Sequence, residues 1–128
     1  MTPNDLRYTK DHEWAKKDGD LLVVGITHYA QDQLGDVVFV ELPPVGKALE
    51  AGQSFGVIEA VKTVSDLYAP VAGEIVEVNP ALAQEPALVN QAPYEGGWMV
   101  KLRPRNLADL DNLLDAAQYK TMIEAQHA

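Results

Sequence analysis

The 128-residue chain is acidic, with 10 Lys and Arg against 19 Asp and Glu and a formal charge of −9 at pH 7. Its 47% hydrophobic and 23% charged residues are typical of one folded domain with one core. The charge argues against nucleic-acid binding, because phosphates are neutralised by clustered Lys and Arg. The absence of Cys excludes disulfides, thiolate nucleophiles and Cys-ligated zinc, so sulfur redox chemistry would require an attached group.

No targeting or membrane segment is evident. Residues 1–7 have neither the basic start and apolar stretch of a secretory signal nor the Arg-rich character of a transit peptide. The longest apolar runs, such as residues 21–24 and 37–40, are too short to cross a bilayer. We therefore expect a soluble, cytoplasmic protein that binds neither nucleic acid nor a membrane.

From Glu13 to about Val100, short β-prone segments alternate with turn residues, a pattern typical of small sandwiches and barrels. The dipeptide Asp18-Gly19 predicts a tight hairpin between strands at residues 14–17 and 20–26. A short connecting helix is expected over residues 28–34, ending at Gly35.

Further strands are predicted at residues 36–42, 53–61, 64–68, 74–78 and 98–102, with a loop or helical turn over 81–97. From Asn106 onward Ala, Leu, Asp and Gln replace Val and Gly, which predicts helices. Asn106 can cap a helix over 107–114, and Asp115 can cap a second one in which Gln118 returns the hydrogen bond. We expect these helices to cover the sheet, and one domain over 1–128, with its core at about 8–103 and a C-terminal helical segment at about 106–125.

Lys62 lies at the joint between two predicted strands, and this joint contains no Gly, Pro or Asn to mark it. Most exposed lysines have no specific role. A hairpin tip, however, holds an ammonium group away from the body of the domain, where a modifying enzyme or a swinging prosthetic arm can use it. If Lys62 is functional, it is therefore a presentation site.

Asp11, His12 and Glu13 form the other polar cluster. Adjacent residues in an extended segment point to opposite faces, so we do not expect these three to converge on one metal ion. One His and one carboxylate could still share a cleft, but the favoured arrangement is a packed Trp14 with solvent-exposed neighbours. The chain also lacks a phosphate-binding Gly-rich loop, a Gly-x-Ser-x-Gly elbow and a paired-His zinc motif, which disfavours an independent enzyme.

Blocks of sequence along nearly the whole chain match one family pattern. They are Tyr8-Thr9-Lys10-Asp11-His12-Glu13-Trp14, Gly25-Ile26-Thr27, Leu34-Gly35-Asp36, residues 37–43, the lysine segment 59–66, Tyr68-Ala69-Pro70-Val71, residues 73–79, Pro93-Tyr94, Gly97-Trp98 and Leu113-Leu114-Asp115-Ala116. Together and in this order they resemble the H proteins of the glycine cleavage system, which carry lipoate. Chance similarity over so many ordered blocks is implausible.

The resemblance implies a mostly β fold, a lipoyl- and biotinyl-domain-like flattened barrel (barrel-sandwich hybrid), with a short connecting helix and a C-terminal helix. It implies lipoate in amide linkage on Lys62 and a non-catalytic carrier without catalytic or metal-binding residues. The implied partners are the PLP-dependent glycine decarboxylase that loads an aminomethyl group, the aminomethyltransferase that removes it, the lipoamide dehydrogenase that reoxidises the dithiol, and a lipoate-attaching enzyme.

By position in the family pattern, Glu13, Asp66 and Asp11 are expected to contact the amine of the loaded arm. Glu59 and Val61 are expected to be recognised by the lipoate-attaching enzyme. The chain departs from the pattern at Ala60 and Ala72, where the family usually has Ser, and the loss of the hydroxyl next to the Val-Lys pair bears on that recognition.

Three alternatives stay open. A biotinyl carrier also presents a lysine on a hairpin, but its lysine is usually flanked by Met, whereas Val61 and Thr63 stand here. An H-like relay protein that passes lipoate to other acceptors would share the same motifs. A small hydrolase using Asp11, His12 or Glu13 is the third, although no nucleophile in the chain supports it.

Overall fold

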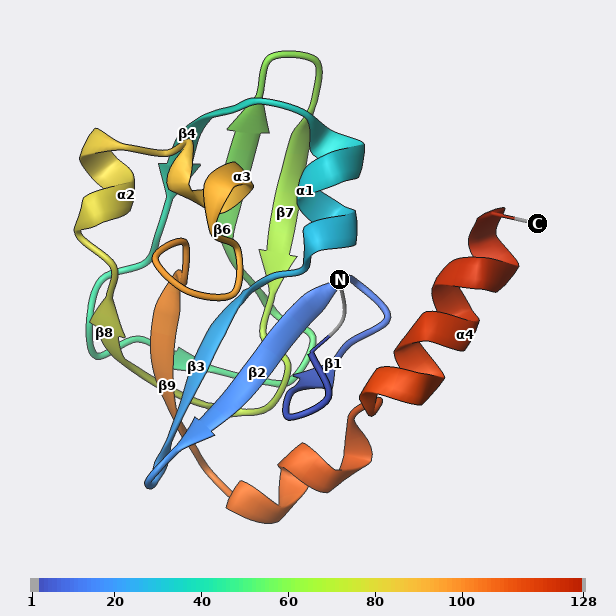
Figure 1. Ribbon diagram of the computed structural model, residues 1–128. Helices are drawn as coiled ribbons and strands as arrows, with labels where there is room; N and C mark the ends of the chain where they lie inside the picture. Colours follow the sequence, from blue (N-terminus) through green and yellow to red (C-terminus); the bar gives the residue numbers. More distant parts are fainter. Residues whose placement is uncertain (1–2, 128) are drawn as a thin grey trace.

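A computed structural model describes residues 3–127 (Figure 1). The strands are β1 (Arg7–Tyr8), β2 (Glu13–Asp18), β3 (Leu21–Ile26), β4 (Val37–Glu41), β5 (Ala48–Leu49), β6 (Ser54–Ala60), β7 (Val64–Tyr68), β8 (Gly73–Val78) and β9 (Val100–Pro104). The helices are α1 (His28–Leu34), α2 (Ala81–Gln84), α3 (Leu88–Gln91), the 3-10 helix η1 (Leu107–Asn112) and α4 (Ala116–His127). None of these helices is long and apolar enough to span a membrane.

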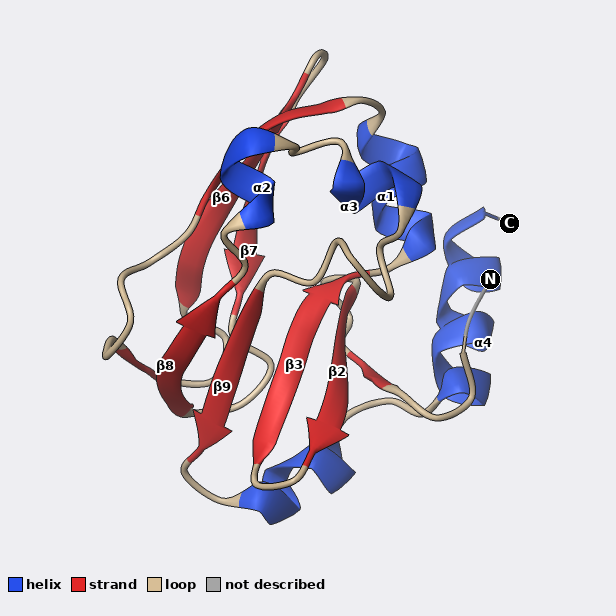
Figure 2. Ribbon diagram, turned by 60° about the vertical axis from the view of Figure 1, so that its left-hand side comes forward, coloured by secondary structure: helices blue, strands red, loops and turns tan. Residues whose placement is uncertain are grey.

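The strands form two antiparallel sheets. One sheet has six strands in the order β1-β2-β3-β9-β8-β5, and the other has three in the order β4-β6-β7. Figure 2 shows α1, α2 and α3 gathered at one end of the larger sheet. Buried side chains from both sheets, including Leu22 and Ile75 on one side and Ile58 and Leu67 on the other, make up one core between them. The lipoyl-domain-like, barrel-sandwich fold expected from the sequence is therefore confirmed.

The local signals in the first third of the chain are confirmed as well. The first hairpin is present, but its two-residue turn is Gly19-Asp20, one residue later than predicted, because Asp18 still pairs with Leu21. Gly19 has a φ of 62°, a value that Gly adopts without steric cost. The hydroxyl of Thr27 caps α1 by accepting from the Ala30 amide at 3.1 Å. The helix ends at Gly35, whose φ is 80°.

The C-terminal third differs from the prediction at one point. The first helical piece is a 3-10 helix that ends at Asn112, two residues before the predicted end. Leu114 instead forms an isolated bridge with Tyr8, in which the amide of each donates to the carbonyl of the other at 2.8 Å. This pairing keeps Leu114 out of the helix. The capping box that begins α4 is confirmed, because Asp115 and Gln118 exchange hydrogen bonds between backbone amide and side chain at 2.8 and 3.0 Å.

The two C-terminal helices do not share one surface. Leu107 and Leu110 of η1 pack against the core between the sheets, as expected of a cover. By contrast α4 belongs to a second cluster, in which the rings of Tyr8 and Tyr119 stack with their centroids 4.6 Å apart. The helix α4 thus packs against the edge strand β1 of the six-stranded sheet, away from the core between the two sheets (Figure 1).

Candidate functional site

Lys62 is exposed at the tip of the β6–β7 hairpin, which projects at the top of Figure 1. The Ala60 amide donates to the Thr63 carbonyl at 2.8 Å to close the tip, and the Val61 amide donates to the Asp36 carbonyl at 3.0 Å. No residue from 61 to 63 has a positive φ, so the turn needs no Gly or Asn. This explains why the sequence gives no turn signal at the position where the hairpin reverses.

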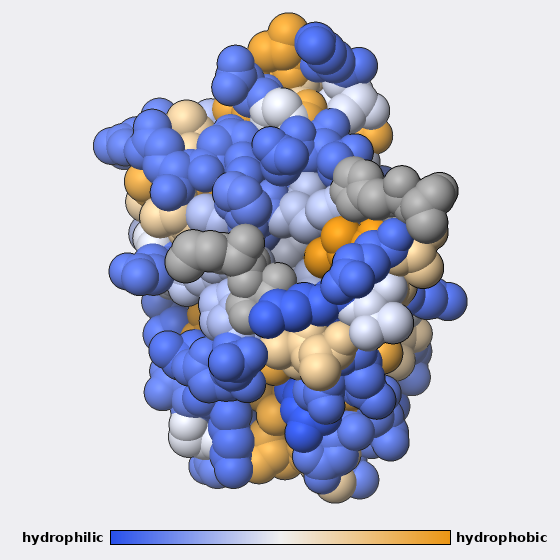
Figure 3. Space-filling view, turned by 45° about the vertical axis from the view of Figure 1, so that its right-hand side comes forward, coloured by the Kyte–Doolittle hydropathy of each residue, from blue (hydrophilic) through white to orange (hydrophobic). Residues whose placement is uncertain are grey.

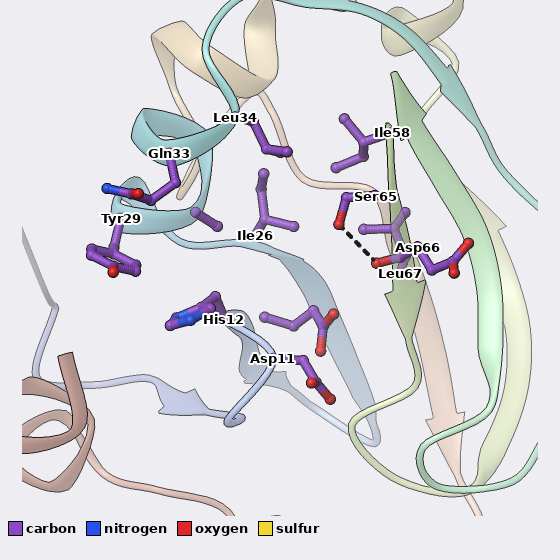
Figure 4. Close-up of a pocket in the computed structure, with 12 residues that line it drawn as sticks. Asp11, His12, Ile26, Tyr29, Gln33, Leu34, Ile58, Ser65, Asp66 and Leu67 are labelled. Atoms are coloured by element: carbon purple, nitrogen blue, oxygen red, sulfur yellow. Dashed lines mark hydrogen bonds between the residues drawn. The ribbon is translucent and has the colours of Figure 1, made fainter. Parts of the chain in front are cut away.

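A hollow of about 250 Å³ lies between α1, the segment before β2 and the edge strand β7 (Figure 4). Its apolar lining comes from Ile26, Tyr29, Ala30, Leu34, Ile58 and Leu67. Its polar lining comes from Asp11, His12, Glu13, Gln33, Ser65 and Asp66. The mixture of an apolar wall and a few polar groups is typical of a ligand site.

Glu13 is the buried acid of this hollow, with only 2% of its surface exposed. The Thr9 hydroxyl donates to its Oε1 at 2.8 Å, and the Tyr68 amide donates to its Oε2 at 3.2 Å. Burial raises the pKa of Glu13 to about 8, because desolvation of the carboxylate outweighs these two hydrogen bonds. Near pH 7 this pKa favours the neutral carboxylic acid of Glu13.

The expectation that Asp11, His12 and Glu13 point to opposite faces is wrong, as is the expectation that Glu13 is solvent-exposed. The chain turns before β2, and His12 has a φ of 69°, so the extended-strand rule does not apply. All three residues line the same hollow as a result. Across residues 3–127, however, no three carboxylates or histidines are grouped so that they could hold a metal ion.

His12 also connects the hollow to α4. Its Nδ1 lies 2.8 Å from the Tyr119 hydroxyl, which lies 2.7 Å from the hydroxyl of the buried Thr27. Burial lowers the pKa of His12, which favours the neutral imidazole. The helix α4 therefore stabilises the wall of the hollow from behind.

The side chain of Asp66 does not join Glu13. Alternation along β7 places Ser65 and Leu67 on the inner face and leaves Asp66 exposed on the outer one. In Figure 4 Ser65 points into the hollow, whereas the Asp66 side chain extends to the other side of β7. Of the three carboxylates predicted to meet, the structure thus brings together Asp11 and Glu13.

Sequence reasoning missed Tyr29 and Gln33, which α1 presents to the hollow (Figure 4). Their i, i+4 spacing on a capped helix is the signal that places them on one face. A neighbouring hollow of about 290 Å³ is lined by Gln33, Leu34 and the tip residue Lys62, together with Asp32, Gly35, Asp36 and Val61. Because the two hollows share Gln33 and Leu34, they are neighbours along α1, one lined by Lys62 and the other by Glu13.

Figure 3 shows this side of the molecule, with the hairpin tip projecting above a hollowed, mixed surface. A third hollow, of about 300 Å³, shares Glu13 with the first and is also lined by Tyr8, Pro70 and residues 112–114. Glu13 and Asp11 line both hollows, so they form part of the wall between them.

Comparison with known proteins gives a consistent result. The family model described as "Glycine cleavage H-protein" matches residues 6–126. The chain is 58% identical over 123 residues to a glycine cleavage system H protein of Bacteroides fragilis, covering 96% of this chain and 98% of the relative. It is 60% identical over 124 residues to one of Thermus thermophilus, covering 97% of each.

A solved structure is also similar. The crystal structure of a glycine cleavage system H protein from Mycobacterium marinum superposes with a TM-score of 0.87 at 44% sequence identity. The match covers 95% of this chain and 98% of that one. Fold and sequence therefore agree over almost the whole length.

Proposed function

Because the chain belongs to the glycine cleavage H-protein family and is the lipoyl-carrying shuttle of the glycine cleavage system, we propose that Lys62 holds the lipoyl group in amide linkage. The observation that carries this assignment is the pair of neighbouring hollows along α1, one lined by the exposed Lys62 and the other by the buried Glu13. An arm attached at the tip would have a surface to lie along and a polar group at its end.

The residues present fit a lipoyl group. Its aliphatic stem matches the apolar wall of Leu34, Ile26 and Tyr29, and its amide linkage needs an accessible amine, which the exposed Lys62 offers. When bound, the group supplies a dithiol that carries the aminomethyl group and exchanges two electrons. The chain itself contains no Cys and so adds no competing thiol.

Glu13 and Asp11 hold the amine of the loaded arm in this proposal. An ammonium group at the end of the hollow favours the ionised carboxylate of Glu13, so its proton leaves as the arm docks. The resulting charge-assisted hydrogen bond forms in a site that the apolar wall partly shields from water. Glu13 thereby protects the loaded group against loss and performs no acid or base catalysis.

The partner enzymes supply the chemistry: a PLP-dependent glycine decarboxylase, an aminomethyltransferase and a lipoamide dehydrogenase. Each gains from the carrier a high local concentration of the arm. The acidic surface of the carrier, with its formal charge of −9, favours basic rims on these partners.

The test is an intact mass of the protein from its native cells, with peptide mapping of residues 59–68 and a Lys62→Arg control. We expect one lipoyl-sized addition on Lys62 that is absent from the control. A biotin-sized addition would support the biotinyl carrier instead. An unmodified lysine in cells that lipoylate other proteins would contradict the assignment and make Ala60 the first residue to test.

A further inference from the structure

The side chain of Asn90, on α3, joins three segments close to the hairpin that carries Lys62. Its Oδ1 accepts from the Val37 amide at 2.9 Å, and its Nδ2 donates to the Gly35 carbonyl at 2.8 Å. Nδ2 also donates to the side-chain oxygen of Gln31 at 3.0 Å, so both of its hydrogens are used. One side chain thus bonds to α1, to the joint that follows α1 and to the first residue of β4.

These hydrogen bonds hold the α1–β4 joint to a distant part of the chain. Asn90 lies 53 and 55 positions from its backbone partners Val37 and Gly35. Its own place is set by its neighbour Val89, which is fully buried in the core between the sheets, and by the packing of α3 against α1 (Figure 2). The core therefore positions the amide that bonds to both sides of the joint.

The α1–β4 joint in turn holds the hairpin tip. The two backbone partners of Asn90 flank Asp36, whose carbonyl accepts from the Val61 amide at 3.0 Å. Val61 precedes Lys62 at the tip, and both residues line the hollow of about 290 Å³ that Asp36 also lines. Because Asn90 fixes the residues on both sides of Asp36, it fixes the carbonyl to which the tip is bonded. The hydrogen bonds thus connect the core to the residue next to Lys62.

We propose that Asn90 is a positioning residue for the lipoyl arm, because it keeps the hairpin tip, and with it the point of attachment, against the hollows along α1. The inference rests on the proposed function of Lys62. A tip that moves freely would carry the root of the arm away from α1, and the arm would reach Glu13 in a smaller fraction of the molecules. In this role Asn90 acts through Asp36 and Val61 and needs no contact with the arm.

Asn79 offers a matched control at a different joint, between β8 and α2. Its Nδ2 donates to the carbonyls of Gly96 and Trp98 at 2.9 and 2.8 Å, and its Oδ1 accepts from the Ala81 amide at 3.1 Å. Like Asn90, it therefore donates two hydrogen bonds and accepts one, but its partners do not belong to the segment that holds the hairpin tip. Removal of either side chain should lower stability by a similar amount, whereas only the removal of Asn90 should affect the tip.

The first measurement is amide hydrogen exchange by NMR on the unlipoylated full-length protein. Asn90→Ala should lower the protection factor of the Val61 amide by about tenfold, because the acceptor of this amide is no longer held in place. Asn79→Ala should leave that protection factor within about twofold of wild type, although its urea midpoint falls by a similar amount. Asn90→Asp is a second variant, which keeps an acceptor for the Val37 amide but cannot donate to the Gly35 carbonyl. It should also lower the protection of Val61.

The second measurement is the decay of the loaded arm, followed by mass in lipoylated protein that the PLP-dependent glycine decarboxylase has loaded. Asn90→Ala should speed this decay by about threefold or more, because a smaller fraction of the arms is docked. Asn79→Ala should stay within about twofold of wild type. In a Glu13→Gln background the substitution of Asn90 should add less than about twofold, because both residues act on the same docked state. A purely structural role would not produce this dependence on Glu13.

The outcomes separate this inference from the assignment of Lys62. An unchanged protection factor of Val61 in both Asn90 variants would overturn the inference, and so would equal decay rates in the Asn90→Ala and Asn79→Ala proteins. Fully additive effects of Asn90→Ala and Glu13→Gln would overturn it too, since Asn90 would then act independently of the docked arm. Failure of the proposed function has a different signature: wild-type Lys62 would carry no lipoyl addition, while Val61 would still lose protection in Asn90→Ala.

Discussion

Lys62 and Glu13 lie at opposite ends of a pair of neighbouring hollows along α1, and their environments are opposite. Lys62 is exposed on a tip that two backbone hydrogen bonds define, whereas Glu13 is buried and held by Thr9 and Tyr68. The tip belongs to the three-stranded sheet, and Glu13 begins a strand of the six-stranded sheet. The proposal thus places attachment of the arm on one sheet and its protection on the other. We therefore expect that a substitution can remove either proposed function without disturbing the other.

The largest effect is expected at the attachment end. Lys62→Arg keeps the positive charge but cannot form the lipoyl amide under the same enzyme, so glycine cleavage activity should fall by at least about a thousandfold. The free energy of unfolding should change by less than about 0.5 kcal/mol, because the side chain is exposed. Activity in a reconstituted system and urea unfolding measure the two quantities. A large loss of stability would contradict the separation of the two ends.

Glu13→Gln removes the carboxylate that we propose protects the loaded arm. The lipoylated variant should still be loaded, but near pH 7.5 the loaded amine should be lost about tenfold faster or more, because a charge-assisted hydrogen bond of about 1.5–3 kcal/mol is absent. The decay of the loaded species, followed by mass, checks this. An unchanged decay rate would remove Glu13 from the proposed role.

The same variant tests the buried acid in the unlipoylated protein. The pKa of Glu13 is raised from 4.5 to about 8 by burial, so between these values the folded state binds a proton that the unfolded state has released. Stability from this group is therefore complete below about pH 4.5 and is lost as the pH rises through 8. Glu13→Gln stays neutral and should be more stable than wild type at pH 9, on the order of 3 kcal/mol. Urea unfolding from pH 4.5 to 9 measures the difference, and parallel curves would contradict it.

A smaller effect, on the free energy of unfolding, is expected at Tyr119, which contacts His12 in the wall of the hollow. Tyr119→Phe removes the hydroxyl between His12 and Thr27, and should cost about 1–2 kcal/mol of stability because the buried Thr27 hydroxyl and the His12 ring lose a partner. Lipoyl attachment to Lys62 should keep its rate, since the tip is carried by the other sheet. Slower attachment in this variant would show that the two ends are coupled.

The smallest effect is expected at Asp66, where a substitution tests whether this residue takes part in holding the loaded arm. Asp66→Asn changes a carboxylate on the outer face of β7, so the decay of the loaded arm should change by less than about twofold at physiological salt. Glu13→Gln is the matched comparison, because both substitutions neutralise one acid of the lining. Equal effects would show that Asp66 turns toward the arm when the site is loaded.

The local structure could be predicted from residues that are neighbours in the sequence. Asp18-Gly19 predicted the first hairpin, Thr27 and Gly35 bounded α1, and Asp115 with Gln118 capped α4, because each signal depends on groups within a few positions of one another. The position of Lys62 at the joint between two β segments could be predicted for the same reason. Its role as the lipoyl site came from the family resemblance of ordered sequence blocks and stays a prediction.

The protecting site depends on residues far apart in the chain. Glu13 meets the Tyr68 amide 55 positions away, and the Tyr119 hydroxyl reaches His12 across 107. Alternation alone would have separated Asp11, His12 and Glu13, and only the turn at His12 puts them on one wall. The sequence by itself therefore determined the strands, the caps and the position of Lys62, since these follow from local backbone preferences. The tertiary structure alone decided the burial of Glu13, the outward direction of Asp66 and the neighbouring hollows along α1, because desolvation and cavity shape depend on which distant segments pack together.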